Sequence, residues 1–425
     1  MSTNRSALVI GLSWEQQPLI DRLFEHGWRL YGVHQQGAVG EARANELANS
    51  FQTIHLCDLR DLDSILRFAT SVHPDCVVSD QCDYSHFAQA FVATALALPG
   101  PSMTAAQISS NKLIQREWSR NHQIDIPEFQ MCHDLEGCRA AAEKVGYPLI
   151  VKPVDNRGSF GVHRVDDAEQ LSDAFLDAMA HSHSRTVLVE EFVVGTHITV
   201  DGYFFPDVGC KSLALATKGL LPGTTNQVAV DIIYPGEMAQ STIDKALAIN
   251  EVVNQRLGYG FGMTHSEYMV TAEERIVLIE SANRGGGCFT SQLIVPAVSG
   301  VDLVGQLISD VAGESRSYFE SPKRVPTLLK FISFPEGKLD RLEGWQELGE
   351  REEVIASRLL VEMGDMIEPI KSDAHRHGFV IFSDDKAQTP SQLRATAEDL
   401  LRNIRINGCG WEPLELTGKV ETQYG

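Results

Sequence analysis

Two glutamates on neighbouring predicted strands are the first feature of this sequence that suggests chemistry. The segments GMTHSEYMV and RIVLIES have the apolar composition of strands, and the polar turn TAEER joins them. A hairpin centred on this turn pairs Glu267 with Glu280 and Val270 with Val277. Alternation along each strand then places Leu278 on the same face as Glu280. We therefore expect two carboxylates to oppose each other across the hairpin.

Opposed carboxylates need a proton, a cation or water between them. Paired side chains in an antiparallel sheet have Cβ atoms about 5 Å apart, and like charges at this distance destabilise the sheet. Two oxygen donors at this spacing suit Mg²⁺, which binds one or two carboxylates together with substrate phosphates. The alternatives are a solvated pair at a sheet edge and a register shifted by one residue. His265 shares the face of Glu267, where it contacts substrate or is a hydrogen-bonded core histidine.

A lysine before a glycine loop is the second feature. In YPLIVKPVDNRGSFGV, Lys152 ends an apolar strand, and turn-forming residues follow at 155–161. An ammonium attracts phosphate, and glycines let backbone N–H groups approach phosphate oxygens. The Walker A pattern GxxxxGK[ST] does not occur in the chain. The alternative is a lysine that reaches solvent beside an ordinary hairpin turn.

Composition limits the classes of partner and location. The chain has 425 residues, so two or three domains are expected, and its net charge of −21 argues against nucleic acid as a partner. No run of eighteen apolar residues occurs, and the first residues lack the plan of a signal peptide, so we expect no membrane association. The eight cysteines form no CxxC motif, which favours reduced thiols and a cytoplasmic location.

The elements that must position these residues follow from the patterns along the chain. Strands at 7–12, 29–33 and 75–80 alternate with predicted helices, which indicates a Rossmann-like α/β domain with a parallel sheet. That domain lacks GxGxxG, so a dinucleotide fingerprint is absent. The Pro-Gly-Pro break before residue 102 marks its end. We expect domains at 1–108, 109–322 and 323–425, the last a C-terminal mixed-sheet lobe.

A third block completes a family pattern. The run TVLVEEFVVGTHITVDGYF contains Glu190 and Glu191, and it lies between the lysine loop and the glutamate hairpin. These blocks, with Asn111 and Lys112 upstream, resemble the ATP-grasp superfamily of carboxylate–amine ligases over roughly residues 100–320. The resemblance implies an ATP-grasp fold, with a small lid subdomain at about 125–195 within the central domain.

The resemblance also implies roles for individual residues. Lys112 and Lys152 match the lysines that bind ATP phosphates, and Arg284 matches a catalytic arginine that faces negative charge on the reacting group. The loop that closes over the phosphates is matched by Gly158, Ser159, Phe160 and Gly161. The hinge that binds adenine is matched by Glu190, Glu191, Phe192 and Val193, and the position that binds ribose is matched by His197. Glu267 and Glu280 match the two metal-binding carboxylates. A histidine stands at 197 where the family often has a glutamate.

One position departs from the family pattern. The usual E-x-N-x-R reads Glu280-Ser-Ala-Asn-Arg here, with Ala282 in the place of the asparagine. Asn283 is then a third metal ligand only if the strand bulges. Glu-x-Ala-x-Arg points to the L-amino-acid ligase and biotin-carboxylase-like branch.

The implied activity is an ATP-dependent ligase that joins a carboxylate to an amine through an acyl phosphate. It would use ATP with Mg²⁺ or Mn²⁺, release ADP and phosphate, and act on small molecules, with amino acids as the expected substrates. A homodimer is compatible with this reading. The alternatives are an ATP-grasp phosphotransferase and a nucleotide-binding protein without ligase activity. The loop 217–227 is a substrate-side or ordinary surface loop, and Arg376 binds a substrate carboxylate or an acidic side chain.

Overall fold

The N-terminal part is a small parallel α/β layer. The computed structural model describes residues 5–156, 158, 160–221, 228–314, 325–370 and 375–413. A four-stranded parallel sheet has the order β3-β2-β1-β4. The alternating pattern predicts a parallel sheet, but β3 was not among the three predicted strands. Its elements are β1 (Ser6–Ile10), α1 (Gln17–Glu25), β2 (Arg29–Gln35), α2 (Ala38–Glu46), β3 (Phe51–Cys57), α3 (Leu62–Val72), β4 (Cys76–Val78) and α4 (Asp83–Leu96).

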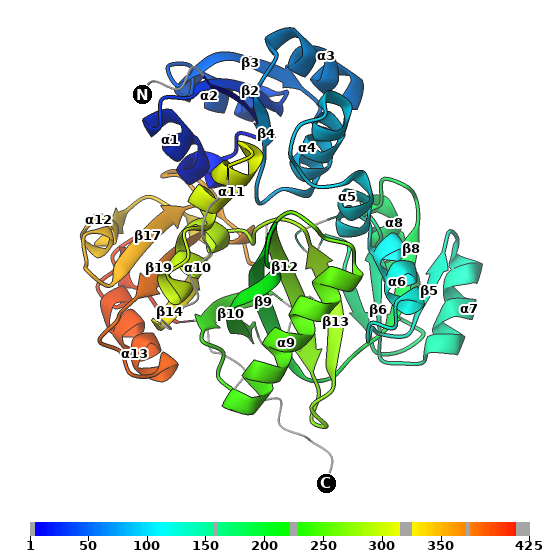
Figure 1. Ribbon diagram of the computed structural model, residues 1–425. Coiled ribbons are helices and arrows are strands. Elements are labelled where there is room, and N and C mark those ends of the chain that lie inside the picture. Colours follow the sequence, from blue (N-terminus) through cyan, green and yellow to red (C-terminus); the bar gives the residue numbers. More distant parts are fainter. Residues whose placement is uncertain are drawn as a thin grey trace.

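A second, antiparallel sheet follows after two connecting helices. The order is β5-β8-β6-β7, and the helices α7 and α8 pack on it through a small apolar core. We call this part, residues 129–191, the small sheet unit (Figure 1, cyan to green). Its elements and the connecting helices are α5 (Met103–Ser110), α6 (Lys112–Asn121), β5 (Phe129–Cys132), α7 (Leu135–Val145), β6 (Leu149–Pro153), β7 (His163–Val165), α8 (Leu171–His181) and β8 (Val187–Glu191).

The largest element is an eight-stranded antiparallel sheet of order β13-β12-β9-β10-β11-β14-β19-β17. It joins strands from the central region with strands from beyond residue 325. Its strands are β9 (Thr196–Phe205), β10 (Gly209–Leu220), β11 (Ala229–Tyr234), β12 (Gly262–Val270), β13 (Ile276–Ala282), β14 (Thr327–Ile332), β17 (Val354–Leu359) and β19 (Gly378–Ser383).

Helices and short strand pairs cover this sheet. The helices are α9 (Gln240–Arg256), α10 (Val295–Ser299), α11 (Leu303–Val311), α12 (Trp345–Gly349) and α13 (Pro390–Leu401). The short strands are β15 (Gly337–Lys338), β16 (Leu342–Glu343), β18 (Met366–Ile367), β20 (Arg405–Ile406) and β21 (Cys409–Gly410). Every pairing among the C-terminal strands is antiparallel, so the expected mixed sheet in that lobe is wrong. The three domain boundaries stay a prediction.

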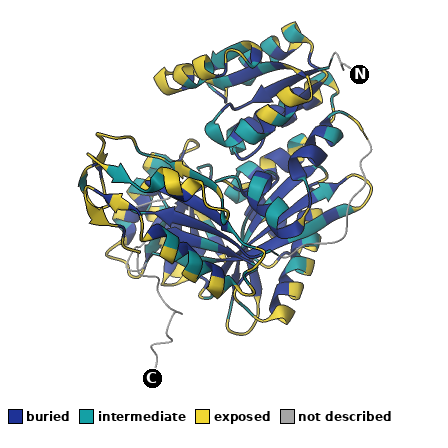
Figure 2. Ribbon diagram, turned by 90° about the vertical axis from the view of Figure 1, so that its left-hand side faces the viewer, coloured by how far each residue is buried: buried dark blue, intermediate teal, exposed yellow. Residues whose placement is uncertain are grey.

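The N-terminal layer and the large sheet share one apolar core. Leu19 and Leu23 of α1 belong to the same buried cluster as Leu303 and Leu307 of α11. The inner strands of the large sheet are largely buried, whereas no residue of its edge strand β17 is buried and the outer turns of the covering helices are exposed (Figure 2). In the described part of the chain, no single helix is long and apolar enough to cross a membrane. One bent pair of helices, 290–299 with 303–311, is together long and apolar enough, by length and composition only.

Candidate active site

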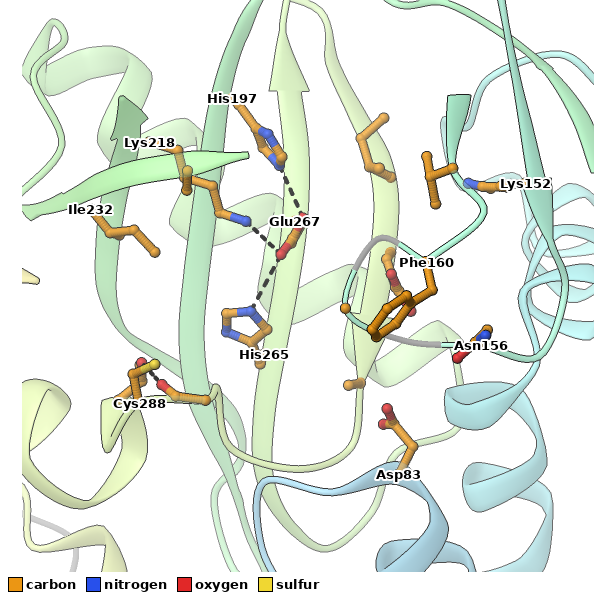
Figure 3. Close-up of a pocket in the computed structure, with 18 of the residues that line it drawn as sticks. Asp83, Lys152, Asn156, Phe160, His197, Lys218, Ile232, His265, Glu267 and Cys288 are labelled. Atoms are coloured by element: carbon orange, nitrogen blue, oxygen red, sulfur yellow. Dashed lines mark hydrogen bonds and ion pairs between the residues drawn. The ribbon is translucent and has the colours of Figure 1, made fainter. Parts of the chain in front are cut away.

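A cleft of about 570 Å³ lies where the three parts meet. The large sheet lines it with side chains from β13, β12, β9, β10, β11 and β14 in spatial order. The small sheet unit adds residues of β6 and β8, and the N-terminal layer adds Trp14, Glu15, Gln81 and Asp83. The centre of the cleft is occupied by charged side chains around Glu267 (Figure 3).

The two glutamates oppose each other as predicted. Glu267 of β12 pairs with Glu280 of β13, and both line the cleft. The predicted partners nearer the turn are wrong, because Val270 pairs with Ile276 and not with Val277. The pairing shifts by one residue at Ile279, which has no partner on β12, so a β-bulge interrupts the ladder.

The bulge also changes which side chains share a face. Leu278 pairs with Tyr268 in a buried apolar cluster, so the expectation that it lies on the face of Glu280 is wrong. Ile279 lines the cleft instead. The Ile279 carbonyl accepts a hydrogen bond from Arg116 Nη2 at 2.6 Å, which satisfies a backbone group that the ladder leaves open.

Lysines of the protein neutralise the paired carboxylates. Lys218 Nζ of β10 lies 2.6 Å from Glu267 Oε1, and His197 Nε2 lies 3.0 Å from Glu267 Oε2. Lys112 Nζ lies 2.9 Å from Glu280 Oε1. Although burial favours protonation of Glu267, Lys218, His197 and His265 together outweigh it, and the pKa of Glu267 lies well below its usual range. Both glutamates are therefore held in ion pairs.

A second set of charges lies behind Glu267. His265 Nδ1 is 2.7 Å from Asp201 Oδ1, and its Nε2 is 3.6 Å from Glu267 Oε1. Tyr234 donates a hydrogen bond to Asp201 Oδ2 at 2.9 Å. Burial alone lowers the pKa of His265, but the Asp201 carboxylate overrides this effect and raises that pKa to about 9. His265 therefore carries a positive charge at neutral pH, unlike an ordinary core histidine.

Lys152 is buried within a three-residue ion cluster and does not reach solvent. Its Nζ lies 2.6 Å from Glu190 Oε2, while Arg116 Nε donates to Glu190 Oε1 at 2.8 Å. Burial lowers the pKa of Lys152 to about 8 despite the charge of Glu190. Burial raises the pKa of Glu190, but Arg116 and Lys152 outweigh it and bring that pKa to about 2.

The start of α6 positions Lys112. Asn111 caps the helix, because its side-chain oxygen accepts a hydrogen bond from the Ile114 N–H at 3.1 Å. Lys112 is the first residue of the helix, and its Nζ donates to the Asn156 carbonyl at 2.9 Å. Burial lowers the pKa of Lys112, but Glu280 outweighs burial, so the net shift is upward. Lys112 thus links the large sheet to the loop after Lys152.

The predicted loop and hinge border the same cleft. Gly158, Phe160 and all four hinge residues from Glu190 to Val193 line it. Gly161 has a φ of 69°, and the Phe160 ring stacks on His181 with centroids 5.8 Å apart. Ser159 lies outside the described residues, as do 222–227 of the predicted substrate-side loop. Arg376 lines the cleft with its guanidinium 3.5 Å from the centre of the Phe331 ring.

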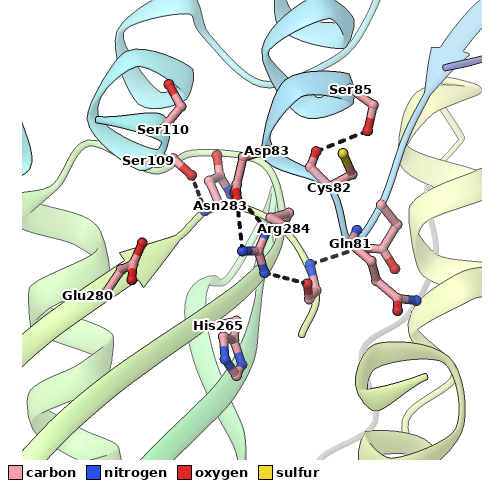
Figure 4. Close-up of polar contacts among 12 residues, drawn as sticks. Gln81, Cys82, Asp83, Ser85, Ser109, Ser110, His265, Glu280, Asn283 and Arg284 are labelled. Atoms are coloured by element: carbon pink, nitrogen blue, oxygen red, sulfur yellow. Dashed lines mark hydrogen bonds and ion pairs between the residues drawn. The ribbon is translucent and has the colours of Figure 1, made fainter. Parts of the chain in front are cut away.

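The structure does not bring Asn283 together with the two glutamates. Its amide donates to the carbonyls of Phe261 and Met263 at 2.8 and 3.1 Å, and it is absent from the lining of the cleft. The strand does bulge, but it does so at Ile279, before Glu280, so Asn283 stays on the buried side. Arg284 turns into the cleft and pairs with Asp83 (Figure 4).

Several charged residues of the site were missed from the sequence, among them Lys218, Arg116, Asp83 and Asp201. Lys218 and Arg116 lie in ordinary strand and helix contexts, and Asp83 lies in the N-terminal layer. The only local signal was that Lys218 falls within the predicted loop 217–227, although residues 217–220 in fact belong to strand β10. Strand order brings it to the site, because β10 lies two positions from β12 in the large sheet.

The residues present fit Mg²⁺ bound together with phosphates. In the described ranges, no three His, Cys, Asp or Glu side chains converge as a metal site. The protein would then supply two carboxylates, Glu267 and Glu280, and Mg²⁺ normally takes its other ligands from water and substrate phosphates. Lys112 and Lys152 lie in the same cleft to receive those phosphates.

Two family models match the chain. The ATP-grasp domain matches residues 145–292, a range that contains both paired glutamates and Lys152. The L-amino acid ligase C-terminal domain 2 matches residues 330–407. The chain therefore contains an ATP-grasp domain, followed by a C-terminal region similar to that of L-amino acid ligases. Its fold class, expected from the sequence blocks, is therefore confirmed.

Individual relatives support the same placement. The chain is 26% identical to the uncharacterized protein y4rH of Sinorhizobium fredii over 74% of its own length and 63% of that protein. It is 24% identical to the L-arginine-specific L-amino acid ligase of Bacillus subtilis, over 75% of its length and 77% of the ligase. The crystal structure of L-amino acid ligase from Bacillus licheniformis matches with a TM-score of 0.80 and 20% identity, covering 96% and 99% of the two chains. This last likeness concerns the fold.

The coverage of other relatives is partial. The chain spans 63% of y4rH and between 40% and 47% of three formate-dependent phosphoribosylglycinamide formyltransferases that it also matches. It thus spans about half the length of several of the curated relatives that it matches.

Proposed function

We propose that this protein is an ATP-dependent ligase that joins the carboxylate of one amino acid to an amine. The reaction would activate the carboxylate as an acyl phosphate and release ADP and phosphate. The observation that carries the proposal is the charge arrangement of the cleft. Lys112 and Lys152 border it from α6 and the small sheet unit, and the paired glutamates border it from the large sheet.

The two ends of the cleft differ in a way that suits this reaction. The end beside the hinge is lined by Ile150, Phe192, Val193, Met269 and Ile279, which provide an apolar slot for a nucleotide base. The opposite end, beyond Lys218 in the order of the strands, is lined by Trp14, Ile232, Leu329, Phe331 and Leu360, with Arg376 beside them. Apolar walls with one cation fit an amino acid that has an apolar side chain.

Each charged group has a distinct role in the proposed reaction. Lys152 and Lys112 bind phosphate oxygens, and Arg284 stabilises the negative charge that develops on the activated carboxylate. Glu267 and Glu280 would hold Mg²⁺, which supplies charge neutralisation for the phosphates when it is bound. The cleft needs no protein nucleophile, because positioning and charge account for catalysis of this kind. Since ATP and free amino acids are cytoplasmic metabolites, we place the reaction in the cytoplasm.

Trapping of the activated carboxylate tests the proposal. The protein is incubated with ATP, Mg²⁺ and single amino acids in the presence of hydroxylamine, which converts acyl phosphates to hydroxamates. We expect hydroxamate and ADP to form together with at least one amino acid, and apolar ones should react best. ADP formation that does not depend on any amino acid, or phosphorylation of a substrate that hydroxylamine does not trap, would contradict a ligase.

A further inference from the structure

We infer that the N-terminal layer sets the position of Arg284, through Asp83 on the side chain and Asp80 on the backbone. The expected effect on catalysis rests on the proposed function, in which Arg284 is a catalytic residue. Nothing in the sequence pattern around Asp80 and Asp83 suggested a role in the site. Both residues come from the end of β4 and the start of α4, about 200 residues before Arg284.

The contact with Asp83 fixes the plane of the guanidinium. Arg284 Nε donates to Asp83 Oδ1 at 2.7 Å, and Nη2 donates to Asp83 Oδ2 at 3.2 Å. Each side chain is only 16% exposed. A bidentate pair constrains orientation as well as distance, which a single contact does not. Arg284 Nη1 also donates to the Gly285 carbonyl at 3.0 Å, so three of its five N–H groups are engaged.

Arg284 has N–H groups beyond these three contacts, and the orientation of the guanidinium decides where they point. Because Nη1 and Nη2 each carry two hydrogens, each has one N–H beyond these three contacts, and Arg284 lines the cleft. A guanidinium that is already oriented loses less freedom when it binds a developing negative charge. Burial lowers the pKa of Arg284, but the charge and hydrogen bonds of Asp83 outweigh burial, so the net shift is upward.

Asp80 holds the backbone that follows Arg284. Its Oδ1 accepts the Gly285 N–H at 2.8 Å, and its Oδ2 accepts Ser291 Oγ at 2.7 Å and Gln292 Nε2 at 2.8 Å. The fit leaves no room for a side chain at Gly285. A Cβ there would lie 2.1 Å from Ser291 Oγ and 2.6 Å from Asp80 Oδ1. The loop after β13 thus contacts the N-terminal layer twice, through the backbone of Gly285 and through the side chain of Arg284.

Steady-state kinetics of Asp83→Asn tests this role. The chain offers a matched control, because Arg275 and Asp125 form a bidentate pair at 2.8 and 2.6 Å on the surface, away from the lining of the cleft. We expect Asp83→Asn to lower kcat by about 100-fold with little change in KM for ATP, because a displaced catalytic group costs transition-state stabilisation. Asp125→Asn should leave both constants unchanged. Equal effects of the two substitutions would overturn the inference.

A second readout does not depend on turnover. Phenylglyoxal modification of Arg284, followed by peptide mass spectrometry, reports how firmly its guanidinium is held. We expect modification several-fold faster in Asp83→Asn than in the wild type and Asp125→Asn, while the rise in melting temperature with ATP is retained. Unchanged modification of Arg284 would refute the positioning role. If the wild type is modified slowly but makes no ligation product, the proposed function fails and the positioning role stands.

Discussion

At the scale of single residues, the paired carboxylates are stabilised by the protein itself. The sequence suggests that Glu267 and Glu280 repel each other unless a proton, a cation or water lies between them. The structure shows instead that Lys218 and Lys112 each neutralise one of them. Removing a carboxylate therefore removes a favourable ion pair as well as a repulsion, so we expect it to destabilise the fold.

Glu280→Gln should lower the free energy of unfolding even without Mg²⁺. Lys112 is 14% exposed and Glu280 is 36% exposed, so the substitution leaves a largely buried ammonium without its carboxylate at a cost of about 1 kcal/mol. Urea denaturation in the presence of EDTA measures this change, and the surface pair Arg341–Glu343 provides Glu343→Gln as control. The same variant should lose the stabilisation by Mg²⁺ and ATP. A variant as stable as the wild type in EDTA would contradict the role of Lys112.

The affinity for ATP should fall as the pH rises above about 8. The pKa of Lys152 is lowered to about 8 by burial, whereas a free lysine has a pKa of 10.5. Phosphates favour the ammonium form, so ATP binding is strong below this pKa and weakens as Lys152 loses its proton. Calorimetric titration with ATP and Mg²⁺ between pH 7 and pH 9.5 measures the change.

The Lys152→Met variant is the control for this pH dependence. It should bind ATP more weakly at pH 7, and its affinity should change less between pH 7 and 9.5 than that of the wild type. His265, with a pKa raised to about 9, lies in the same cleft and accounts for part of the remaining change. An equal pH dependence in the two proteins would show that Lys152 does not contact the phosphates.

At the scale of elements, the hairpin of β12 and β13 shows which structural features a local sequence pattern predicts and which it does not. The alternation of apolar and polar residues predicts both strands and the pairing of Glu267 with Glu280. It does not predict the bulge at Ile279, because the partner that stabilises it, Arg116, lies on the helix α6, far away in the sequence. A local pattern cannot encode that contact, so the predicted partner of Val270 is one residue wrong.

The loop after Lys152 provides a prediction at the same scale. Gly161 has a φ of 69°, and a Cβ there would lie 3.0 Å from His181 Cβ and 3.1 Å from Ala178 Cα of α8. Gly161→Ala therefore combines backbone strain with displacement of the loop. We expect ATP to bind about tenfold more weakly, because the left-handed backbone conformation costs a non-glycine residue about 1–2 kcal/mol of free energy. Gly258→Ala is the control, because Gly258 has a φ of 76° with open space around it. Equal ATP affinities of the two variants would show that the loop does not bind nucleotide.

At the scale of the whole molecule, the site is assembled by contacts that sequence patterns do not contain. Lys112, Lys152 and the glutamates were found because each lies in a recognisable block. Lys218 and Asp83 were not, because the order of strands in the large sheet and the docking of the N-terminal layer bring them in. The N-terminal layer, in which no site residue was predicted from the sequence, contributes residues to the wall of the cleft.

Formation of a carbon–nitrogen bond tests the central claim most directly. The protein is incubated with ATP, Mg²⁺ and pairs of amino acids, and ADP, phosphate and condensed products are quantified by mass spectrometry. We predict one product whose mass equals that of the two amino acids less one water, formed in equal amounts with ADP and phosphate. Consumption of ATP in the presence of amino acids without any condensed product would contradict the proposed ligase.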